Sequence, residues 1–476
     1  MERFNILLSS LKIKFSVFIY VLTISIFSLL SVNNISLSQY FIPFQVTILI
    51  FSLFIGIKYY FYNFVIFLLL SYEFGFFLNG IDFYSFKNTS FFDINFGILF
   101  SLPLFVFILF NPNFDPLFKK NYFSLFSRIF LLLFFSGTIM LFFTLIINDN
   151  DVLVFNNLFL LVFNRLYYFL VPYFFFILYL TLSRKQNFLK ELKTLFFFIL
   201  VSISISKFFG IYFNIFSVTF GQEVLLVTDI NFFTPFLLLF ALDLKSNYLK
   251  MITFLLGIST IFLTIIYNPN GKSFLIILIV LLITLIKLFV KYRTYFIFIG
   301  GASIVFFLFI LSTIQLDQFT INKLNEVLSV ISFWRSDWFD SLPTSPRYRV
   351  AQFINIIIEY LNKPFYFFFG KGYFGTYRDY INGFTEGYLS AFTKQEYDNN
   401  IYYYVHDAVN IIPLTHGLFG IIATLSLFKK LLTSFSLSNY LIIGFVWFVV
   451  YYGFSFNISL FGVLSLFIGI TEIDIK

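Results

Sequence analysis

The sequence contains no cysteine, only two histidines and few charged residues. The absence of cysteine excludes disulfides, thiolate metal sites and a cysteine nucleophile. With His406 and His416 as the only histidines, little room remains for a histidine-rich metal site. Charged residues make up 11% of the chain, against about 25% in an average soluble domain. So few charges cannot cover a water-soluble protein of this length, and the surplus apolar surface is expected to face lipid.

Hydrophobic residues, by contrast, make up 60% of the chain. Apolar runs of about 16–24 residues recur, and a helix needs about 20 residues to cross the hydrocarbon core. We therefore predict an all-α, polytopic transmembrane bundle of about 14 spans. The predicted spans lie near 15–32, 40–57, 61–78, 96–110, 124–147, 166–182, 194–216, 234–244, 251–267, 274–290, 296–315, 406–428, 440–454 and 458–471. The span at 234–244 is short, and we expect it to begin earlier, near Ile230.

The basic residues predict which side of the membrane each loop occupies. With the N-terminus inside, the inner segments hold 19 Lys and Arg residues, and the short outer loops hold 3: Lys87, Arg165 and Lys272. This bias predicts that both termini are cytoplasmic. It also divides the chain into helices 1–11 (1–315), a large extracytoplasmic loop (316–405) and helices 12–14 (406–476). The net charge of +8 is then mostly topological, and we predict no nucleic-acid partner.

A phosphate-binding loop of the form GxxxxGK[ST] is also missing. The polar inner loops are short and offer no cytosolic domain for ATP. Any work done by this chain is therefore not driven by nucleotide hydrolysis within it.

The outer segment 316–405 has 90 residues and holds eight basic and nine acidic residues. Loops of this length are usually functional or disordered, and this one is too aromatic to be disordered. Residues 350–361 have apolar positions at helical spacing, which predicts an amphipathic helix along the membrane surface. Trp334, Trp338, Tyr373 and Tyr377 suggest either stacking on sugar rings or an interfacial aromatic belt.

Three patterns follow one another at the end of this segment: SPRYRVAQF at 345–353, FGKGYFGTY at 369–377 and HDAVNIIPLTHGLFG at 406–420. In order, spacing and predicted sidedness they resemble the C-terminal region of the O-antigen ligase/polymerase superfamily of bacterial polysaccharide assembly. The resemblance covers roughly residues 268–425. The matching positions are Arg349, Phe353, Pro364, Gly370, Gly372, His406, Gly417 and Gly420.

Two positions depart from the family pattern. Lys272 stands where an Arg is usual at the outer start of an earlier span, and Asp407 follows the histidine where an Asn is common. A basic role for Lys272 stays plausible, but its geometry does not carry over from the family.

The resemblance implies glycosyl transfer from a polyprenyl diphosphate, with no cofactor and no bound metal. The leaving diphosphate carries negative charge, which Arg binds well because its planar fork stays charged. Arg347, Arg349 and Lys272 are the candidate cations, and Lys207, within a predicted span, is another candidate for the diphosphate. The alternative is that these cations pair with carboxylates of the loop or with lipid headgroups, since surface ion pairs are commonplace.

His406, at the outer membrane boundary, is the candidate general base for the acceptor hydroxyl. The alternative is a histidine that only caps its helix. Gly370 and Gly372 allow a close backbone approach to phosphate or sugar, or else an ordinary loop turn. His416 has no counterpart in the pattern, and we interpret it as structural.

Within this family the fourteen predicted spans and the biased composition favour a polymerase, which transfers the growing glycan to the next lipid-linked repeat unit at the outer face of the bacterial cytoplasmic membrane. One alternative is the ligase, which transfers glycan to a lipid A core. An alternative of another class is a flippase for lipid-linked oligosaccharide. The implied partners are the polyprenyl-diphosphate-linked oligosaccharide, membrane lipids and a chain-length regulator protein.

Overall fold

The computed structural model divides into two compact units that do not follow the order of the chain. Unit 1 comprises Met1–Phe91, Asn95–Phe100 and Tyr179–Leu324, and unit 2 comprises Phe92–Ile94, Ser101–Leu178 and Asn325–Lys476. The structure describes residues 2–71, 90–91, 94–110, 125–146, 162–163, 165–169, 187–219, 222–225, 229–244, 246–267, 271–291, 334, 337–373, 375–384, 392, 394–403, 405, 408–433, 442–443 and 446. Strands in the described residues are short: β1 (Ser90–Phe91) pairs with β2 (Ile94–Asn95).

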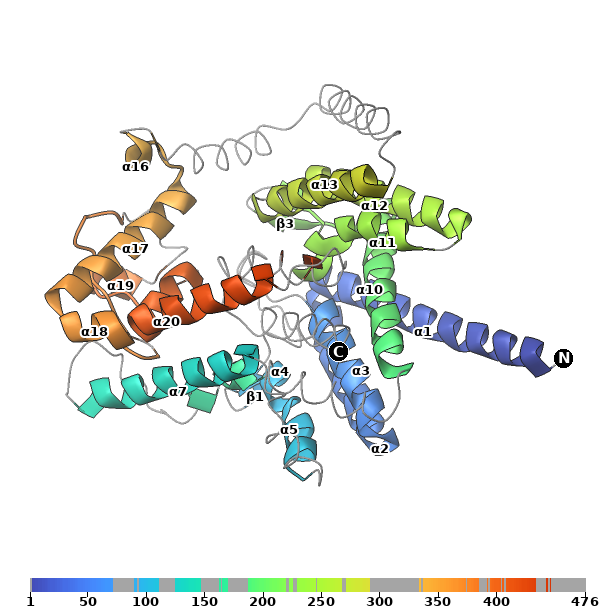
Figure 1. Cartoon of the computed structure of the whole chain (residues 1–476), viewed down its shortest axis with the longest axis horizontal. Helices are drawn as coiled ribbons and strands as arrows, with labels where there is room; N and C mark the ends of the chain where they lie inside the picture. The colour runs from blue at the N-terminus through green and yellow to red at the C-terminus, as the bar shows by residue number, and fades with distance from the viewer. Residues whose placement is uncertain are drawn as a thin grey trace. The chain divides into compact units, whose positions relative to one another are not determined.

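Unit 1 is a helical assembly built around its N-terminal helices (Figure 1). Its described helices are α1 (Glu2–Asn33), α2 (Ile35–Ile55), α3 (Ile57–Leu70), α4 (Phe96–Leu99), α10 (Asn187–Tyr212), α11 (Leu237–Asp243), α12 (Asn247–Tyr267), α13 (Gly271–Lys291) and the 3-10 helix η3 (Asp229–Phe236). An antiparallel hairpin joins β3 (Ser217–Thr219) to β4 (Gln222–Val224). Helices α1 and α10 pack together, and the buried Ser25 and Ser206 hydroxyls hydrogen-bond across them at 2.8 Å.

Unit 2 contains the helices of the predicted outer segment together with two long apolar helices. Its described helices are α5 (Leu102–Leu109), α7 (Leu125–Ile146), η2 (Leu166–Phe169), α16 (Trp338–Ser341), α17 (Thr344–Asn362), α18 (Pro364–Phe369), α19 (Lys394–Asn399) and α20 (Ala408–Thr433). Helix α18 packs on both α17 and α20, and α20 packs on α7 (Figure 1). Helix α20 breaks at Gly417, whose φ of 59° is not helical.

Six described helices are long and apolar enough to cross a membrane, which supports a membrane protein. They are Phe15–Asn33, Leu37–Ile55, Arg128–Ile146, Glu191–Tyr212, Asn247–Tyr267 and Val409–Lys429. Shorter apolar helices cover four more predicted spans, at Ile57–Leu70, Phe96–Phe107, Phe233–Asp243 and Ser273–Phe289. The 3-10 helix η3 begins at Asp229 and leads into α11, close to the start expected for the eighth span, but the start of a span there stays a prediction. The spans at 296–315 and 458–471, and nearly all of 166–182 and 440–454, lie outside the described residues, so the count of fourteen stays a prediction.

Several tyrosines of the outer segment form part of an aromatic core in unit 2. Its buried residues are Met140, Tyr348, Ala351, Ile356, Tyr360, Tyr366, Tyr377, Phe384, Phe392, Tyr402 and Leu414. Tyr377 and Tyr402 pair through backbone hydrogen bonds of 2.9 Å in both directions, and their rings stack. Tyr373 and Tyr377 are buried, so their rings are not exposed for stacking on sugars, whereas Trp334 remains exposed.

Helix α17 confirms the predicted helix at 350–361 and extends it toward the N-terminus. Pro346 lies in its first turn, where a missing N–H breaks no helical hydrogen bond. Its buried face carries polar side chains at helical spacing, namely Gln352, Asn355 and Glu359, whereas Leu361 is exposed. This helix therefore turns polar groups inward as well as apolar ones.

Candidate functional site

The two arginines of the first motif lie on α17 with different surroundings. The Arg347 guanidinium lies 3.5 Å from the exposed Asp340 carboxylate, and its centre is 5.2 Å from the centroid of the Phe339 ring. An exposed ion pair of this kind contributes at most about 1 kcal/mol. Arg349, two residues later, is half-buried, and its backbone carbonyl contacts α20.

That contact comes from Asn410, in the first turn of α20. The Asn410 Nδ2 atom donates to the Arg349 carbonyl oxygen at 3.0 Å and to Gln352 Oε1 at 3.2 Å. The opposite amide orientation would place Oδ1 against two acceptors, so the hydrogen-bond network assigns this one. Asn410 is 1% exposed. The arginine-bearing helix is thus tied to the helix that follows His406 in the chain.

Gln352 extends this network into the aromatic core. Its Nε2 atom donates to the Tyr348 hydroxyl at 2.8 Å and to the Tyr377 hydroxyl at 2.9 Å. All three side chains are buried, and burial raises the pKa of the Tyr348 phenol. Because every polar atom of the Gln352 amide is engaged, the network holds α17 in one rotational setting.

A second buried amide ties the loop 377–384 to the same helix. Asn355 Nδ2 donates to Asp379 Oδ1 at 2.7 Å, and Asn355 Oδ1 accepts from the Tyr380 backbone N–H at 2.8 Å. The Asp379 carboxylate also accepts from the backbone N–H groups of Gly383 and Phe384. The amide nitrogen and the amide oxygen of Asn355 therefore both hydrogen-bond to this loop and fix it to α17.

The glycines of the second motif lie against two apolar helices. A Cβ at Gly370 would lie 2.3 Å from the Thr415 carbonyl carbon, and one at Gly372 would lie 2.2 Å from the Leu141 backbone nitrogen. Both residues have positive φ, at 75° and 77°. The Gly372 N–H donates to Thr415 O at 3.1 Å. These contacts give both glycines a close-packing role, and phosphate binding by them stays a prediction.

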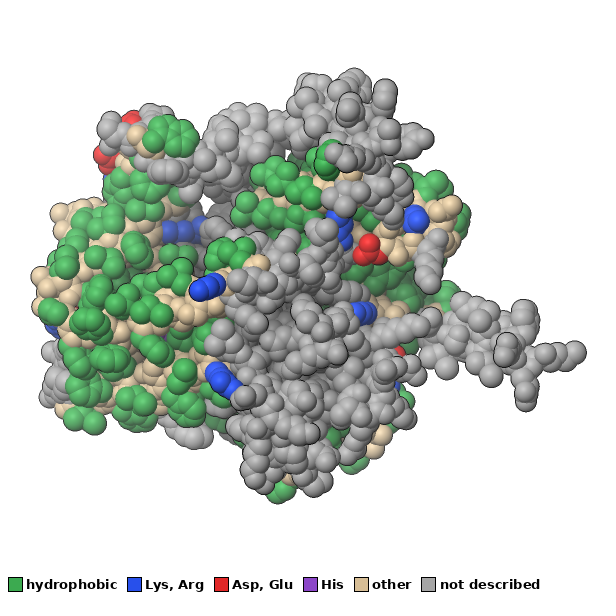
Figure 2. Space-filling model, in the orientation of Figure 1, with side chains coloured by type: hydrophobic (Ala, Val, Ile, Leu, Met, Phe, Trp, Pro, Cys, Tyr) green, Lys and Arg blue, Asp and Glu red, His purple; other side chains and the backbone are tan. Residues whose placement is uncertain are grey.

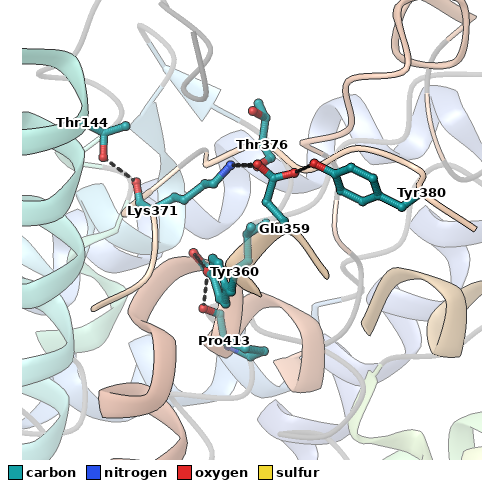
Figure 3. Close-up of polar contacts among 8 residues, drawn as sticks. Thr144, Glu359, Tyr360, Lys371, Thr376, Tyr380 and Pro413 are labelled. Atoms are coloured by element: carbon teal, nitrogen blue, oxygen red, sulfur yellow. Dashed lines mark hydrogen bonds and ion pairs between the residues drawn. The ribbon is translucent and has the colours of Figure 1, made fainter. Parts of the chain in front are cut away.

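Between these glycines, Lys371 forms a buried ion pair with α17 (Figure 3). Its Nζ lies 2.9 Å from Glu359 Oε1 and donates to the Thr376 carbonyl at 2.7 Å. The Tyr380 hydroxyl donates to the other Glu359 oxygen at 2.5 Å. Lys371 and Glu359 are 0% and 3% exposed, so the pair is fully desolvated. Such a pair contributes little net stability, but removal of one partner leaves a buried charge.

His416, interpreted from sequence as structural, lies at the centre of a third polar cluster. Its Nδ1 lies 2.9 Å from Ser136 Oγ and its Nε2 lies 3.0 Å from the Tyr168 hydroxyl. Ser136 also donates to the Leu133 carbonyl at 3.0 Å. The network is satisfied when Nδ1 carries the proton and Tyr168 donates to Nε2. The Arg165 guanidinium lies 5.6 Å from the centre of the Tyr373 ring, which is nearly perpendicular to the His416 ring at a centroid distance of 6.1 Å.

The two predicted lysines belong to unit 1 and are placed within it. Lys207 is buried on α10, and its Nζ donates to Thr234 Oγ1 at 2.9 Å and to Thr264 Oγ1 at 2.8 Å. Lys272 is the second residue of α13. His406 lies outside the described residues. The roles predicted for these three residues stay predictions.

Sequence reasoning missed the residues that connect the motifs. Gln352, Asn355 and Glu359 recur at helical spacing in an otherwise apolar stretch, which is a readable signal of a buried polar stripe. Asn410 carries no such signal, because only the packing of α17 against α20 brings it to Arg349. Ser136 and Tyr168 carry no local signal, because only the fold brings them to His416.

Comparison of the chain with known protein families, curated proteins and solved structures finds no match.

Proposed function

We propose that this chain is a membrane glycosyltransferase that polymerises lipid-linked polysaccharide repeat units. The observation that carries the proposal is the hydrogen bond from Asn410 to the Arg349 carbonyl. It ties the helix bearing the two candidate arginines to the start of α20, which begins two positions after the candidate base His406. The motif order that resembles the ligase/polymerase superfamily supports the same assignment.

The proposed reaction joins two lipid-linked substrates. A hydroxyl of the acceptor repeat unit attacks the anomeric carbon of the donor glycan and forms the new glycosidic bond. The bond between that carbon and the phosphate oxygen breaks, and the polyprenyl diphosphate leaves with the bonding electrons. His406 takes the proton from the acceptor hydroxyl. Arg349 stabilises the charge that develops on the diphosphate, and Arg347 contributes once its exposed pair with Asp340 opens.

The fold supports this proposal in a second way. The catalytic cation must be held in place while charge develops, because misplacement by about 1 Å costs on the order of 100-fold in rate. The backbone of Arg349 is held by Asn410, and its helix is held by Gln352 and by the Glu359–Lys371 pair. Much of the buried polar network in the described part of unit 2 thus serves to position α17.

Deletion of the gene in its native bacterium tests the proposal in cells. A polymerase predicts surface glycan that carries only single repeat units, restored to long polymer by the wild-type gene. Full-length polymer that is not attached to its lipid acceptor would instead indicate that the chain is the ligase. Unchanged surface glycan in both Arg349→Gln and His406→Ala strains would contradict both transferases.

A further inference from the structure

The segment that carries the two motif glycines, Gly370 and Gly372, packs against the candidate spans α7 and α20, far from their ends. The Tyr373 hydroxyl donates to the Phe134 carbonyl of α7 at 3.1 Å, and Gly372 lies against Leu141. The span of α7 ends at Ile146, so at 1.5 Å per residue these contacts lie roughly 8–18 Å from its end. Half of a typical hydrocarbon core is about 15 Å. Part of the segment predicted to lie outside is therefore level with the middle of a span.

Helix α20 gives the same depth independently. Its span begins at Val409, and a Cβ at Gly417 would lie 2.7 Å from the Phe367 carbonyl oxygen of α18. Eight residues of helix correspond to about 12 Å. Helix α18 therefore lies beside residues of α20 that are well inside its candidate span.

The backbone carbonyls of α20 at this depth accept hydrogen bonds from the glycine-bearing segment and from α17. The break at Gly417 frees carbonyls in the preceding turn of α20. The Leu414 carbonyl accepts from the Lys371 N–H at 2.8 Å and from the Tyr360 hydroxyl at 2.9 Å, and the Thr415 carbonyl accepts from Gly372. Non-helical backbone is tolerated at membrane depth only where it is buried in protein or lines a cavity. The glycine-bearing segment meets that condition, and so does the charge of Lys371, which faces Glu359.

The opposite side of the same segment presents aromatic rings outward. Leu361 is 73% exposed, and Phe365, Phe368 and Phe369 are 48%, 54% and 49% exposed. The Phe365 ring lies 5.0 Å from the Phe143 ring of α7, so the exposed aromatics continue the apolar face of a span. Figure 2 shows hydrophobic side chains covering much of the described surface of this unit. An apolar surface of this kind is unfavourable in water.

We propose that residues 363–373, together with 375–377, belong to a re-entrant segment, immersed in the membrane leaflet at the end where α20 begins. Acyl chains of that leaflet cover Phe365, Phe368 and Phe369, while the polar side of the segment faces α17, α7 and α20. Bilayer lipid is the occupant because the exposed rings continue the apolar face of α7. The proposal concerns the course of the chain and does not depend on glycosyl transfer.

Because the chain contains no cysteine, single-cysteine labelling tests this directly. Phe368→Cys, Phe143→Cys and Asp398→Cys would each carry a nitroxide in liposomes of phosphatidylethanolamine and phosphatidylglycerol. The measurement compares collision of the label with oxygen, which partitions into acyl chains, and with a water-soluble nickel chelate. Asp398 is an exposed residue of α19 and serves as the aqueous control, and Phe143 serves as the control on a span.

The proposal predicts that the Phe368 label matches the Phe143 label, with nickel collision much lower than at Asp398 and with high oxygen collision. Nickel collision at Phe368 as frequent as at Asp398 would overturn it, because the segment would then face water. A Phe368 label shielded from both oxygen and nickel would also overturn it, because protein would then cover the face. Thermal unfolding within the range of the cysteine-free parent shows that each labelled protein is folded.

Discussion

Asn410 donates a hydrogen bond of 3.0 Å to the backbone carbonyl of Arg349, sixty-one positions earlier in the chain. This contact joins two segments that the sequence motifs leave separate. It acts on the backbone of Arg349, so it sets where the α17 helix lies rather than where the guanidinium points.

Replacing Asn410 is therefore expected to reduce chain elongation without removing a substrate-binding charge. We predict that Asn410→Ala lowers the elongation rate about 10- to 100-fold, because a shift of about 1 Å costs on the order of 100-fold. Asn410→Asp should be worse, since its oxygen would face the Arg349 carbonyl and Gln352 Oε1. Asn399→Ala, at an exposed residue of α19, is the matched control. Wild-type elongation by Asn410→Ala would remove Asn410 from the positioning network.

The buried pair of Lys371 and Glu359 makes a prediction about stability. Lys371→Met should lower the free energy of unfolding by about 3–5 kcal/mol, because it leaves a buried carboxylate without its cation. Adding Glu359→Gln should recover much of that loss, since no buried charge then remains. Urea unfolding in detergent measures both, and Lys394→Met, at an exposed position, is the control. A double variant as unstable as Lys371→Met alone would show that the loss has another cause.

Tyr348 predicts how unfolding responds to alkaline pH. Burial raises the pKa of its phenol above the ordinary value of about 10. The folded state then holds the proton more tightly than the unfolded state, so this contribution is complete below pH 10 and falls as pH rises further. Tyr348→Phe lacks the titrating group and also loses the hydrogen bond from Gln352.

We therefore expect Tyr348→Phe to be less stable than wild type at pH 8 and to close that gap above pH 10. Urea unfolding at a series of pH values measures the difference in free energy. A gap that stays constant between pH 8 and pH 11 would contradict a raised phenol pKa at this position.

The cluster at His416 predicts a single tautomer. Ser136 gives its proton to the Leu133 carbonyl, so the imidazole proton lies on Nδ1 and Nε2 accepts from Tyr168. Nitrogen-15 chemical shifts of the two histidine rings, assigned with His416→Gln, measure this directly. Tyr168→Phe should cost about 1–3 kcal/mol by leaving Nε2 without a donor. A proton on Nε2 in the wild-type spectrum would contradict the assigned direction of the network.

Much of the fold could be predicted from sequence, because apolar length and helical periodicity act locally. The helix at 350–361 is confirmed. The role of Gly370 and Gly372 could not be predicted, because close packing and phosphate binding both require a small residue with positive φ. The Asn410–Arg349 contact was also beyond prediction, since it depends on how α17 and α20 pack.

Elongation of a defined substrate by the purified protein tests the central claim most directly. The substrate is a synthetic polyprenyl-diphosphate repeat unit, followed by separation of glycan chains by length and by release of free polyprenyl diphosphate. The account predicts a ladder of lengthened glycans, persistence of that ladder in EDTA and its loss in Arg349→Gln. Movement of the substrate across liposomes without any lengthening would contradict it and would identify a transporter instead.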